Sequence, residues 1–257
     1  FIKGIQDYEL IEPGDKIAVC ISGGKDSMLL AKLLQELQRH GKFHFDLEFI
    51  CMDPGYNPAN RKLIEENAEK LGIPIQFYES DIFNVVHGIE KNPCYLCARM
   101  RRGFLYNRAQ ELGCNKIALG HHYSDVIETI LMGMMYGAQV QTMMPKLHSK
   151  NFKGMELIRP MYLIHEEDII AWAEKFNLKF LQCACRFIEE SEARGEIEHT
   201  SKRAETKMLI KKLREINPKV EQNIFKSVEN ANLKTIIAYT DWDESKKSFL
   251  DFYKEQD

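Results

Sequence analysis

The stretch of sequence that decides the fold is Ile17-Ala18-Val19-Cys20-Ile21-Ser22-Gly23-Gly24-Lys25-Asp26-Ser27. Its first half is apolar and rich in β-branched residues, which predicts a buried strand over about 16–22. Gly23 and Gly24 predict a turn, because glycine adopts backbone angles that other residues avoid. Good helix formers with one apolar face follow over about 26–40. This turn is a candidate anion site, since unpaired N–H groups and the positive end of the helix dipole meet there.

Strands and helices continue to alternate along the chain. Further strands are predicted at 45–53, 74–80, 116–122 and 179–182, and two extended segments within 139–161. Helices are predicted at 58–72, 97–113, 125–136, 165–176, 200–216 and 218–239. The alternation predicts an α/β fold, with a parallel five-stranded Rossmann-like sheet covered by helices on both faces. We expect a first domain at 1–185 and a helical C-terminal extension at 186–257, with functional loops at the carboxyl ends of the strands.

The composition narrows the class of protein. Hydrophobic residues make up 44% and charged residues 28% of the 257 residues, as in soluble globular proteins. No apolar run is long enough to span a bilayer, so we expect a cytoplasmic protein without a membrane partner. Seven unevenly spaced cysteines argue against a disulfide framework. The net charge of −3 conceals two basic clusters, which are Arg99, Arg101, Arg102 and Arg108, and Lys202, Arg203, Lys207, Lys211, Lys212, Arg214 and Lys219.

Polar residues at the ends of three predicted strands are candidate site residues. The candidate phosphate ligands in the glycine turn are Ser22, Gly23, Gly24, Lys25 and Ser27. Asp26 either holds Mg²⁺ or caps the helix. Asp53 ends the second strand, with a turn-starting role before Pro54-Gly55 as the alternative. His121 and His122 are adjacent on the predicted fourth strand, so their side chains point to opposite faces and do not share one metal ion.

Cys94-x-x-Cys97 is the second feature with chemical content. Two thiolates at this spacing hold one soft metal, the first from a loop and the second from the start of a helix, whose N-terminus favours the thiolate. A redox pair, half of a zinc site and two unligated thiols are the alternatives. Cys183-x-Cys185 is too tight for the usual second pair of a zinc site. The other cysteines are interpreted as small core residues: Cys20, Cys51 and Cys114.

These motifs resemble those of a known superfamily. Ser-Gly-Gly-Lys-Asp-Ser at 22–27 is similar to the PP-loop signature of the N-type ATP pyrophosphatases, which cleave ATP to AMP and pyrophosphate while adenylating a substrate. Over 4–185 the chain resembles the tRNA 2-thiocytidine synthetases, the TtcA family. The segments that carry this resemblance are Cys94-Tyr-Leu-Cys97-Ala-Arg99-Met-Arg101-Arg102-Gly103, Gly120-His121-His122, Asp125, Met135-Tyr136-Gly137 and Ile158-Arg159-Pro160.

The resemblance implies ATP and Mg²⁺ at the carboxyl edge of the sheet. In the superfamily the backbone at Met52 and Asp53 reads adenine and ribose. The element that begins at Gly120 lies near the nucleotide. Its Asp125 is then a candidate for Mg²⁺ binding or substrate orientation, with a plain helix cap as the alternative.

The resemblance also implies a [4Fe–4S] cluster. In the family Cys94, Cys97 and a third, distant cysteine ligate the cluster, and the fourth iron carries the sulfur to be transferred. Cys183 lies where the third ligand is expected. The family commonly shows Pro-Cys-x-x-Cys there, whereas this chain has Gln182-Cys183-Ala184-Cys185, so Cys185 is held as an alternative.

The implied activity is an ATP-dependent tRNA sulfurtransferase. The C2 oxygen of an anticodon-loop cytidine attacks the α-phosphate of ATP, and sulfur then displaces AMP to give 2-thiocytidine, with Lys25, Asp125 and Cys183 as catalytic residues. The implied partners are tRNA, a sulfur donor such as a cysteine desulfurase or sulfide, and a second copy of the chain in a homodimer. The basic clusters then contact the RNA backbone. The alternatives are a PP-loop thiolase or ligase acting on another base or small molecule, and a nucleotide-binding sensor without turnover.

Overall fold

The computed structural model describes residues 1–82, 85, 93–181 and 201–253, with only the backbone at 93–95. The chain divides into two compact units. The first unit contains residues 1–126 and 143–201, and the second unit contains residues 127–142 and 202–257. Helix α6 (Tyr123–Gly137) therefore begins in the first unit and ends in the second. The predicted domain boundary after residue 185 lies outside the described residues and stays a prediction.

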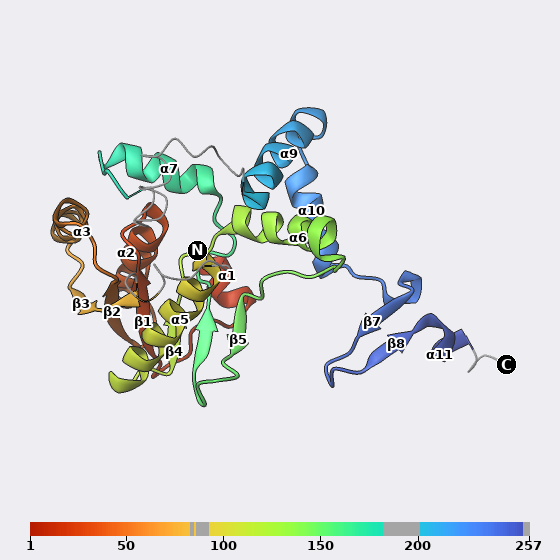
Figure 1. Ribbon diagram of the computed structural model, residues 1–257, viewed down its shortest axis with the longest axis horizontal. Helices are drawn as coiled ribbons and strands as arrows, with labels where there is room; N and C mark the ends of the chain where they lie inside the picture. Colours follow the sequence, from red (N-terminus) through yellow and green to blue (C-terminus); the bar gives the residue numbers. More distant parts are fainter. Residues whose placement is uncertain (83–84, 86–92, 182–200, 254–257) are drawn as a thin grey trace. The chain divides into compact units, whose positions relative to one another are not determined.

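The first unit is built on a six-stranded sheet with the strand order β3-β2-β1-β4-β6-β5 (Figure 1). The strands are β1 (Lys16–Ile21), β2 (Asp46–Asp53), β3 (Ile75–Glu79), β4 (Lys116–Ala118), β5 (Lys146–His148) and β6 (Glu156–Ile158). The neighbours from β3 to β6 are parallel, and β5 pairs with β6 in the antiparallel direction. The α/β class and five parallel strands are confirmed, while the total of five strands is corrected to six.

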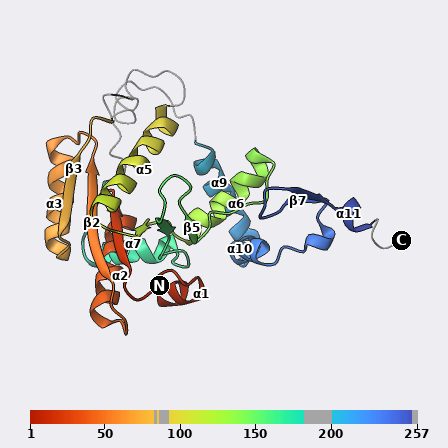
Figure 2. The same ribbon diagram turned by 90° about the horizontal axis from the view of Figure 1, so that it is seen from below.

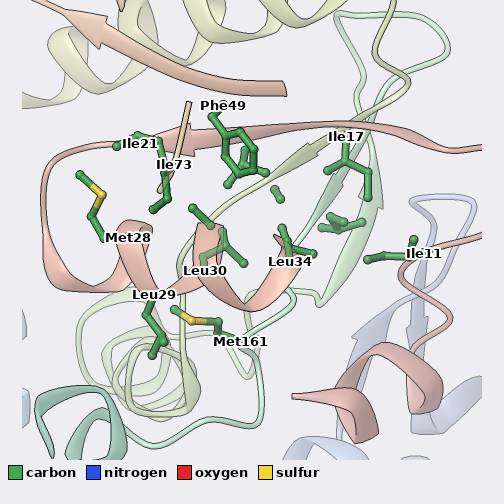
Figure 3. Packing of buried hydrophobic residues seen from close by; sticks show 14 of the residues in the cluster. Ile11, Ile17, Ile21, Met28, Leu29, Leu30, Leu34, Phe49, Ile73 and Met161 are labelled. Carbon is green, nitrogen blue, oxygen red and sulfur yellow. The ribbon is translucent and has the colours of Figure 1, made fainter. Parts of the chain in front are cut away.

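Helices cover both faces of this sheet. They are α1 (Ile2–Asp7), α2 (Lys25–His40), α3 (Pro58–Leu71), α5 (Pro93–Glu111) and α7 (Glu166–Lys175). On one face α2 buries Met28, Leu30 and Leu34 against β1 and β2 (Figure 3). Ile64 of α3 and Ile169 of α7 belong to the same core. On the other face α5 packs Tyr106 and Ala109 on the sheet. Figure 2 shows α3 and α5 on opposite sides of β2 and β3.

Three elements near the strand ends differ from the sequence prediction. The strand predicted at 116–122 ends at Ala118, because the chain leaves the sheet to pack Gly120 against α2. The helix predicted at 97–113 begins at Pro93, a residue that suits the first position of a helix. The strand predicted at 179–182 is absent over 179–181, where the described chain is irregular, and β6 takes the place beside β4.

Buried charges at the amino ends of the strands are paired. Lys116 is 2% exposed, and its Nζ lies 2.8 Å from Asp15 Oδ2 and 3.3 Å from Glu156 Oε2. Asn115 Nδ2 donates to Asp15 Oδ1 at 2.7 Å, and the backbone N–H of Glu12 donates to Oδ2 at 2.6 Å. Burial acts to raise the pKa of Asp15, but these bonds outweigh it and lower the pKa below its ordinary value.

The second unit contains the predicted C-terminal helices in part. α9 (Lys202–Ile216) agrees with the prediction, whereas the helix predicted at 218–239 is observed only as α10 (Val220–Glu229). The Asn232 side chain accepts a bond from the backbone N–H of Lys234, which competes with helix continuation. A 3₁₀ turn η1 (Leu233–Thr235), a hairpin of β7 (Ala238–Thr240) and β8 (Lys246–Ser248), and α11 (Phe249–Tyr253) complete the described part of this unit.

One buried ion pair holds α9 against the part of α6 in the second unit. Glu128 is 4% exposed, and its Oε2 lies 2.7 Å from Nη1 of Arg203. Thr206 and Ile210 are buried on the same side of α9. None of the helices in the described part of the chain is both long enough and apolar enough to span a membrane.

Candidate active site

The turn between β1 and α2 is shaped by its own side chains. Ser27 Oγ donates to Gly24 O at 3.0 Å and accepts from the N–H and the hydroxyl of Ser22 at 3.1 and 3.2 Å. Gly23 has φ of +82°, and a Cβ there would lie 2.8 Å from Ile64 Cδ1 of α3. The turn therefore requires glycine for two reasons, and the two hydroxyls hold it closed around the start of α2.

A cavity of about 300 Å³ opens beside this turn at the carboxyl ends of the strands. Its volume is at the lower end of the range for small-molecule sites. The residues that line it come from the turn, from the ends of β1 and β2, from the loop after β4 and from α5, and they are Cys20, Ile21, Ser22, Asp26, Ser27, Met52, Arg101, Leu105, Leu119, Gly120, His121 and Asp125. The cavity thus brings together predicted site residues from three separate segments, and α5 adds a fourth.

Lys25 is held by two carboxylates. Its Nζ lies 3.0 Å from Asp26 Oδ1 and 3.3 Å from Glu166 Oε1 at the start of α7. Burial acts to lower the pKa of Lys25, but these carboxylates raise it above its ordinary value, so the ammonium is charged. Lys25 is absent from the lining of the cavity, although it was expected to face phosphate.

Asp26 faces the cavity and does not cap α2. The N-cap of α2 is Gly24, and no side chain bonds to it. The capping interpretation of Asp26 is therefore wrong. Its Oδ1 is buried and accepts no hydrogen bond of good geometry from the described residues. A buried carboxylate oxygen of this kind suits a cation ligand.

The loop after β4 carries Gly120, His122 and Asp125 against the start of α2. A Cβ on Gly120 would lie 3.1 Å from the backbone of Asp26 and Ser27. Asp125 Oδ2 accepts the backbone N–H of His122 at 3.0 Å and lies 3.4 Å from its Nε2. Asp125 lies inside the first turn of α6 and is not its cap residue, although its carboxylate accepts the N–H of the residue before the helix and also lines the cavity. His121 and His122 lie in a loop, so the argument from strand alternation does not apply to them.

The end of β2 closes another side of the cavity. Met52 is buried and lines it. Asp53 Oδ1 accepts the N–H groups of Gly55 and Tyr56 at 2.9 and 2.8 Å, and Oδ2 lies 2.6 Å from Nη1 of Arg61. Burial acts to raise the pKa of Asp53, but these bonds lower it below its ordinary value. The turn-starting role of Asp53 is confirmed, and its contact with a ligand stays a prediction.

Helix α5 lines the same cavity through Arg101 and Leu105 and also carries the Cys-x-x-Cys segment, although Cys97 is not among the lining residues. Cys94 and Cys97 both lie in its first turns, one helical turn apart in the backbone, so neither comes from a preceding loop. Cys97 is half-buried and packs with Met100 against Met52 and Ile82. The side chain of Cys94 and all of Cys183 and Cys185 lie outside the described residues. The described residues contain no group of three or more His, Cys, Asp or Glu side chains arranged to hold a metal.

The family model of the PP-loop domain matches residues 3–185. The chain belongs to the PP-loop family. The match includes every strand of the six-stranded sheet and the whole lining of the cavity.

Two curated relatives from this PP-loop family are tRNA-cytidine(32) 2-sulfurtransferases. The one from Neisseria meningitidis serogroup C (strain 053442) is 40% identical over 182 residues, which are 70% of this chain and 57% of the relative. The one from Anaeromyxobacter dehalogenans (strain 2CP-C) is 38% identical over 184 residues, which are 70% of this chain and 63% of the relative. The chain therefore spans about three fifths of the length of these relatives.

A solved structure shows the same PP-loop fold. It is the U34-tRNA thiolase NcsA from Methanococcus maripaludis with its [4Fe-4S] cluster, which is 22% identical to this chain with a TM-score of 0.69. The similarity covers 91% of this chain and 78% of that chain. At this level of identity the likeness concerns the fold.

Sequence reasoning missed two residues of this PP-loop site. Glu166 reaches Lys25 across 141 positions of sequence, and only its place in the acidic first turn of α7 was visible. Arg101 was assigned to an RNA-binding cluster, yet it lines the cavity. The signal was its spacing, because Arg101 follows Cys97 by four residues and Leu105 follows by four more, which places all three on one face of a helix.

Proposed function

We propose that this chain is an ATP-dependent tRNA-cytidine 2-sulfurtransferase of the cytoplasm, which adenylates C2 of an anticodon-loop cytidine and replaces the oxygen with sulfur. One observation carries the proposal. Helix α5, which carries the Cys-x-x-Cys segment, lines the cavity beside the PP-loop through Arg101 and Leu105, and Cys97 packs against the cluster of Met52, which lines the same cavity, so a thiol lies next to the candidate nucleotide site. The identity of 40% and 38% to named tRNA-cytidine(32) 2-sulfurtransferases supports the choice of substrate.

The residues around the cavity suit ATP with Mg²⁺. The N–H groups at Gly23 and Gly24 and the N-terminus of α2 are donors for phosphate. Asp26 and Asp125 both line the cavity, and the buried Oδ1 of Asp26 accepts no hydrogen bond of good geometry from the described residues, although Nζ of Lys25 lies 3.0 Å from it. Mg²⁺ is typically held by one or two carboxylates together with substrate phosphates, so these two carboxylates suffice.

The thiolates proposed to hold a [4Fe–4S] cluster are those of Cys94, Cys97 and Cys183, with Cys185 as the alternative to Cys183. Of these, Cys97 has a described side chain, which is half-buried beside Met52 at the cavity. A soft thiolate at the edge of a nucleotide cavity fits an iron–sulfur group better than an oxygen-preferring cation. When bound, the cluster supplies the sulfur that replaces the activated oxygen.

The chain itself prepares the leaving group. Attack by the C2 oxygen of cytidine on the α-phosphorus forms an O–P bond and releases pyrophosphate. The N–H groups of the PP-loop and the charges around it offset the negative charge that develops during this transfer. Asp125 is positioned by its bond to the backbone of His122, so it can orient the base or the metal without moving the loop.

The proposed partner is tRNA, whose phosphate backbone is bound by exposed basic residues. Arg99 and Arg102 of α5 are exposed, whereas Arg108 pairs with Glu111 and lies over the ring of Tyr78. We assign the RNA contact to Arg99 and Arg102, together with the exposed lysines of α9, and predict that binding weakens as salt rises. A separate sulfur donor and assembly as a homodimer belong to the same proposal.

Alanine variants of the cysteines test this function. Cys94→Ala, Cys97→Ala and Cys183→Ala are each expected to abolish the brown colour of anaerobically purified protein and the formation of 2-thiocytidine in tRNA. Cys114→Ala, a buried cysteine of the core, is the matched control and should keep both. Cys185→Ala decides between the two candidates for the third ligand. Normal thiolation by Cys97→Ala would contradict the proposal.

Two alternative functions give different results in the same preparation. A colourless zinc-containing protein would indicate a ligase rather than a thiolase. A nucleotide sensor would release no pyrophosphate when tRNA is added to the protein with ATP. Mass spectrometry of tRNA nucleosides from a deletion strain would identify the modified base by its loss.

A further inference from the structure

Arg101 differs from the other arginines of its helix. It is half-buried and lines the cavity, whereas Arg99 and Arg102 are exposed. It follows Cys97 by one helical turn, and Leu105 on the next turn lines the cavity as well. The exposed arginines therefore face solvent, while Arg101 belongs to the wall of the nucleotide site.

The charge on Arg101 has no acidic partner in the described part of the chain. Ion pairs hold Arg61 to Asp53, Arg108 to Glu111 and Lys25 to Asp26 and Glu166, but none of the described carboxylates lies within ion-pair distance of Arg101. Burial raises the pKa of Cys51 and of Tyr56, and the charge of Arg101 acts in the opposite direction on both.

The cavity needs such a cation when a nucleotide enters. Asp26 and Asp125 already place two carboxylates on its walls, and a triphosphate adds further negative charge. Lys25, the cation expected from the sequence, is engaged by two carboxylates and does not line the cavity. A guanidinium binds phosphate through two parallel N–H···O bonds, which suits a side chain that lines this cavity.

We propose that Arg101, on the Cys-x-x-Cys helix, binds the phosphates of ATP and does not contact the RNA. The inference rests on the proposed function, since it names a nucleotide ligand of the same cavity. It assigns two roles to one basic cluster: Arg101 contacts the nucleotide inside the cavity, and Arg99 and Arg102 contact RNA outside it. α5 then contacts ATP through Arg101 and carries Cys97 about one turn and Cys94 about two turns before it.

Two binding measurements on the full chain separate these roles. The affinity for ATP with Mg²⁺ is measured by calorimetry without tRNA, and the affinity for tRNA is measured over a series of salt concentrations without ATP. Arg101→Gln is expected to weaken ATP binding by about tenfold to hundredfold, the loss typical of a hydrogen bond to a charged group. The same variant should leave the affinity for tRNA and its salt dependence unchanged.

Matched variants on the same helix make the comparison specific. Arg108→Gln removes an arginine outside the cavity and should bind ATP within about twofold of the wild type. Arg102→Gln should bind ATP normally, and should weaken tRNA binding and reduce its logarithmic salt slope by about one. Arg101→Lys keeps the charge without the planar fork, so its ATP affinity should fall between those of Arg101→Gln and the wild type.

The outcomes distinguish this inference from the proposed function. If the wild type binds ATP and Arg101→Gln binds it with the same affinity, the inference about Arg101 is overturned and the proposed function is not. Loss of tRNA affinity with a reduced salt slope in Arg101→Gln, at unchanged ATP affinity, overturns it in favour of an RNA contact. Failure of the wild type to bind ATP overturns both the inference and the proposed function.

Discussion

Substitution of Gly23 by alanine is predicted to destabilise the first unit through two separable effects. A φ of +82° costs an L-residue about 1–2 kcal/mol. The added Cβ would lie 2.8 Å from both Cγ1 and Cδ1 of Ile64, which is fully buried, and overpacking of a core costs about 1–3 kcal/mol. Together these effects remove about 2–5 kcal/mol from the free energy of unfolding.

Urea unfolding followed by tryptophan fluorescence measures this loss. The chain has two tryptophans, of which Trp172 packs beside the core of the first unit and Trp242 is 95% exposed in the second. In a Trp242→Phe background the emission therefore reports on the first unit alone. Gly72→Ala is the matched control, because Gly72 also has positive φ, +66°, but no atom lies within 4 Å of its Cβ position.

A double variant isolates the steric part of the cost. Ile64→Ala removes both clashing atoms and by itself costs about 2–5 kcal/mol. The pair Gly23→Ala and Ile64→Ala should therefore be less destabilised than the sum of the two single variants, by about 1–3 kcal/mol. If the losses of unfolding free energy in the two single variants simply add in the double variant, the proposed contact between the PP-loop and α3 is refuted. If Gly23→Ala and Gly72→Ala lose the same free energy of unfolding, backbone strain alone explains the effect.

Two further predictions concern buried charges. The pKa of Asp15 is lowered in the folded chain, so its stabilisation is present above about pH 4 and is lost as the pH falls through the folded pKa. Asp15→Asn should therefore flatten the acid side of a plot of urea midpoint against pH, and a plot as steep as that of the wild type would contradict this. Arg203→Met leaves the buried Glu128 carboxylate without this ion-pair partner and should cost about 1–3 kcal/mol. Faster hydrogen exchange of the α9 amides is the expected readout, with unchanged exchange in α2.

The sequence predicted the parts of the fold that depend on local patterns. The β-branched run before Ser22 and the glycine turn are local features, and both are observed as expected. The strand predicted through His122 was too long, because the contact between Gly120 and α2 ends it and is non-local. The helix predicted to 239 failed at Asn230 and Asn232, whose local hydrogen bonds favour turns over helix.

The candidate site was predicted in composition more than in geometry. Ser22, Asp26, Ser27 and Asp125 line one cavity, as their positions at strand ends indicated, and Cys97 packs against the cluster of Met52, which lines it as well. The engagement of Lys25 by Glu166 could not be predicted, because it depends on where α7 packs against α2. The role of Arg101 depends on the rotation of α5 about its axis, which a cluster of neighbouring charges in sequence conceals.

The close packing of Gly120 on the first turn of α2 restricts what residue can stand at position 120. A Cβ added to Gly120 would lie only 3.1 Å from the backbone of Asp26 and Ser27, so the two backbone segments are too close to admit a side chain between them. Any side chain at position 120 would collide with this backbone and would separate the loop that leads to Asp125 from the first turn of α2, two parts that both contribute residues to the cavity.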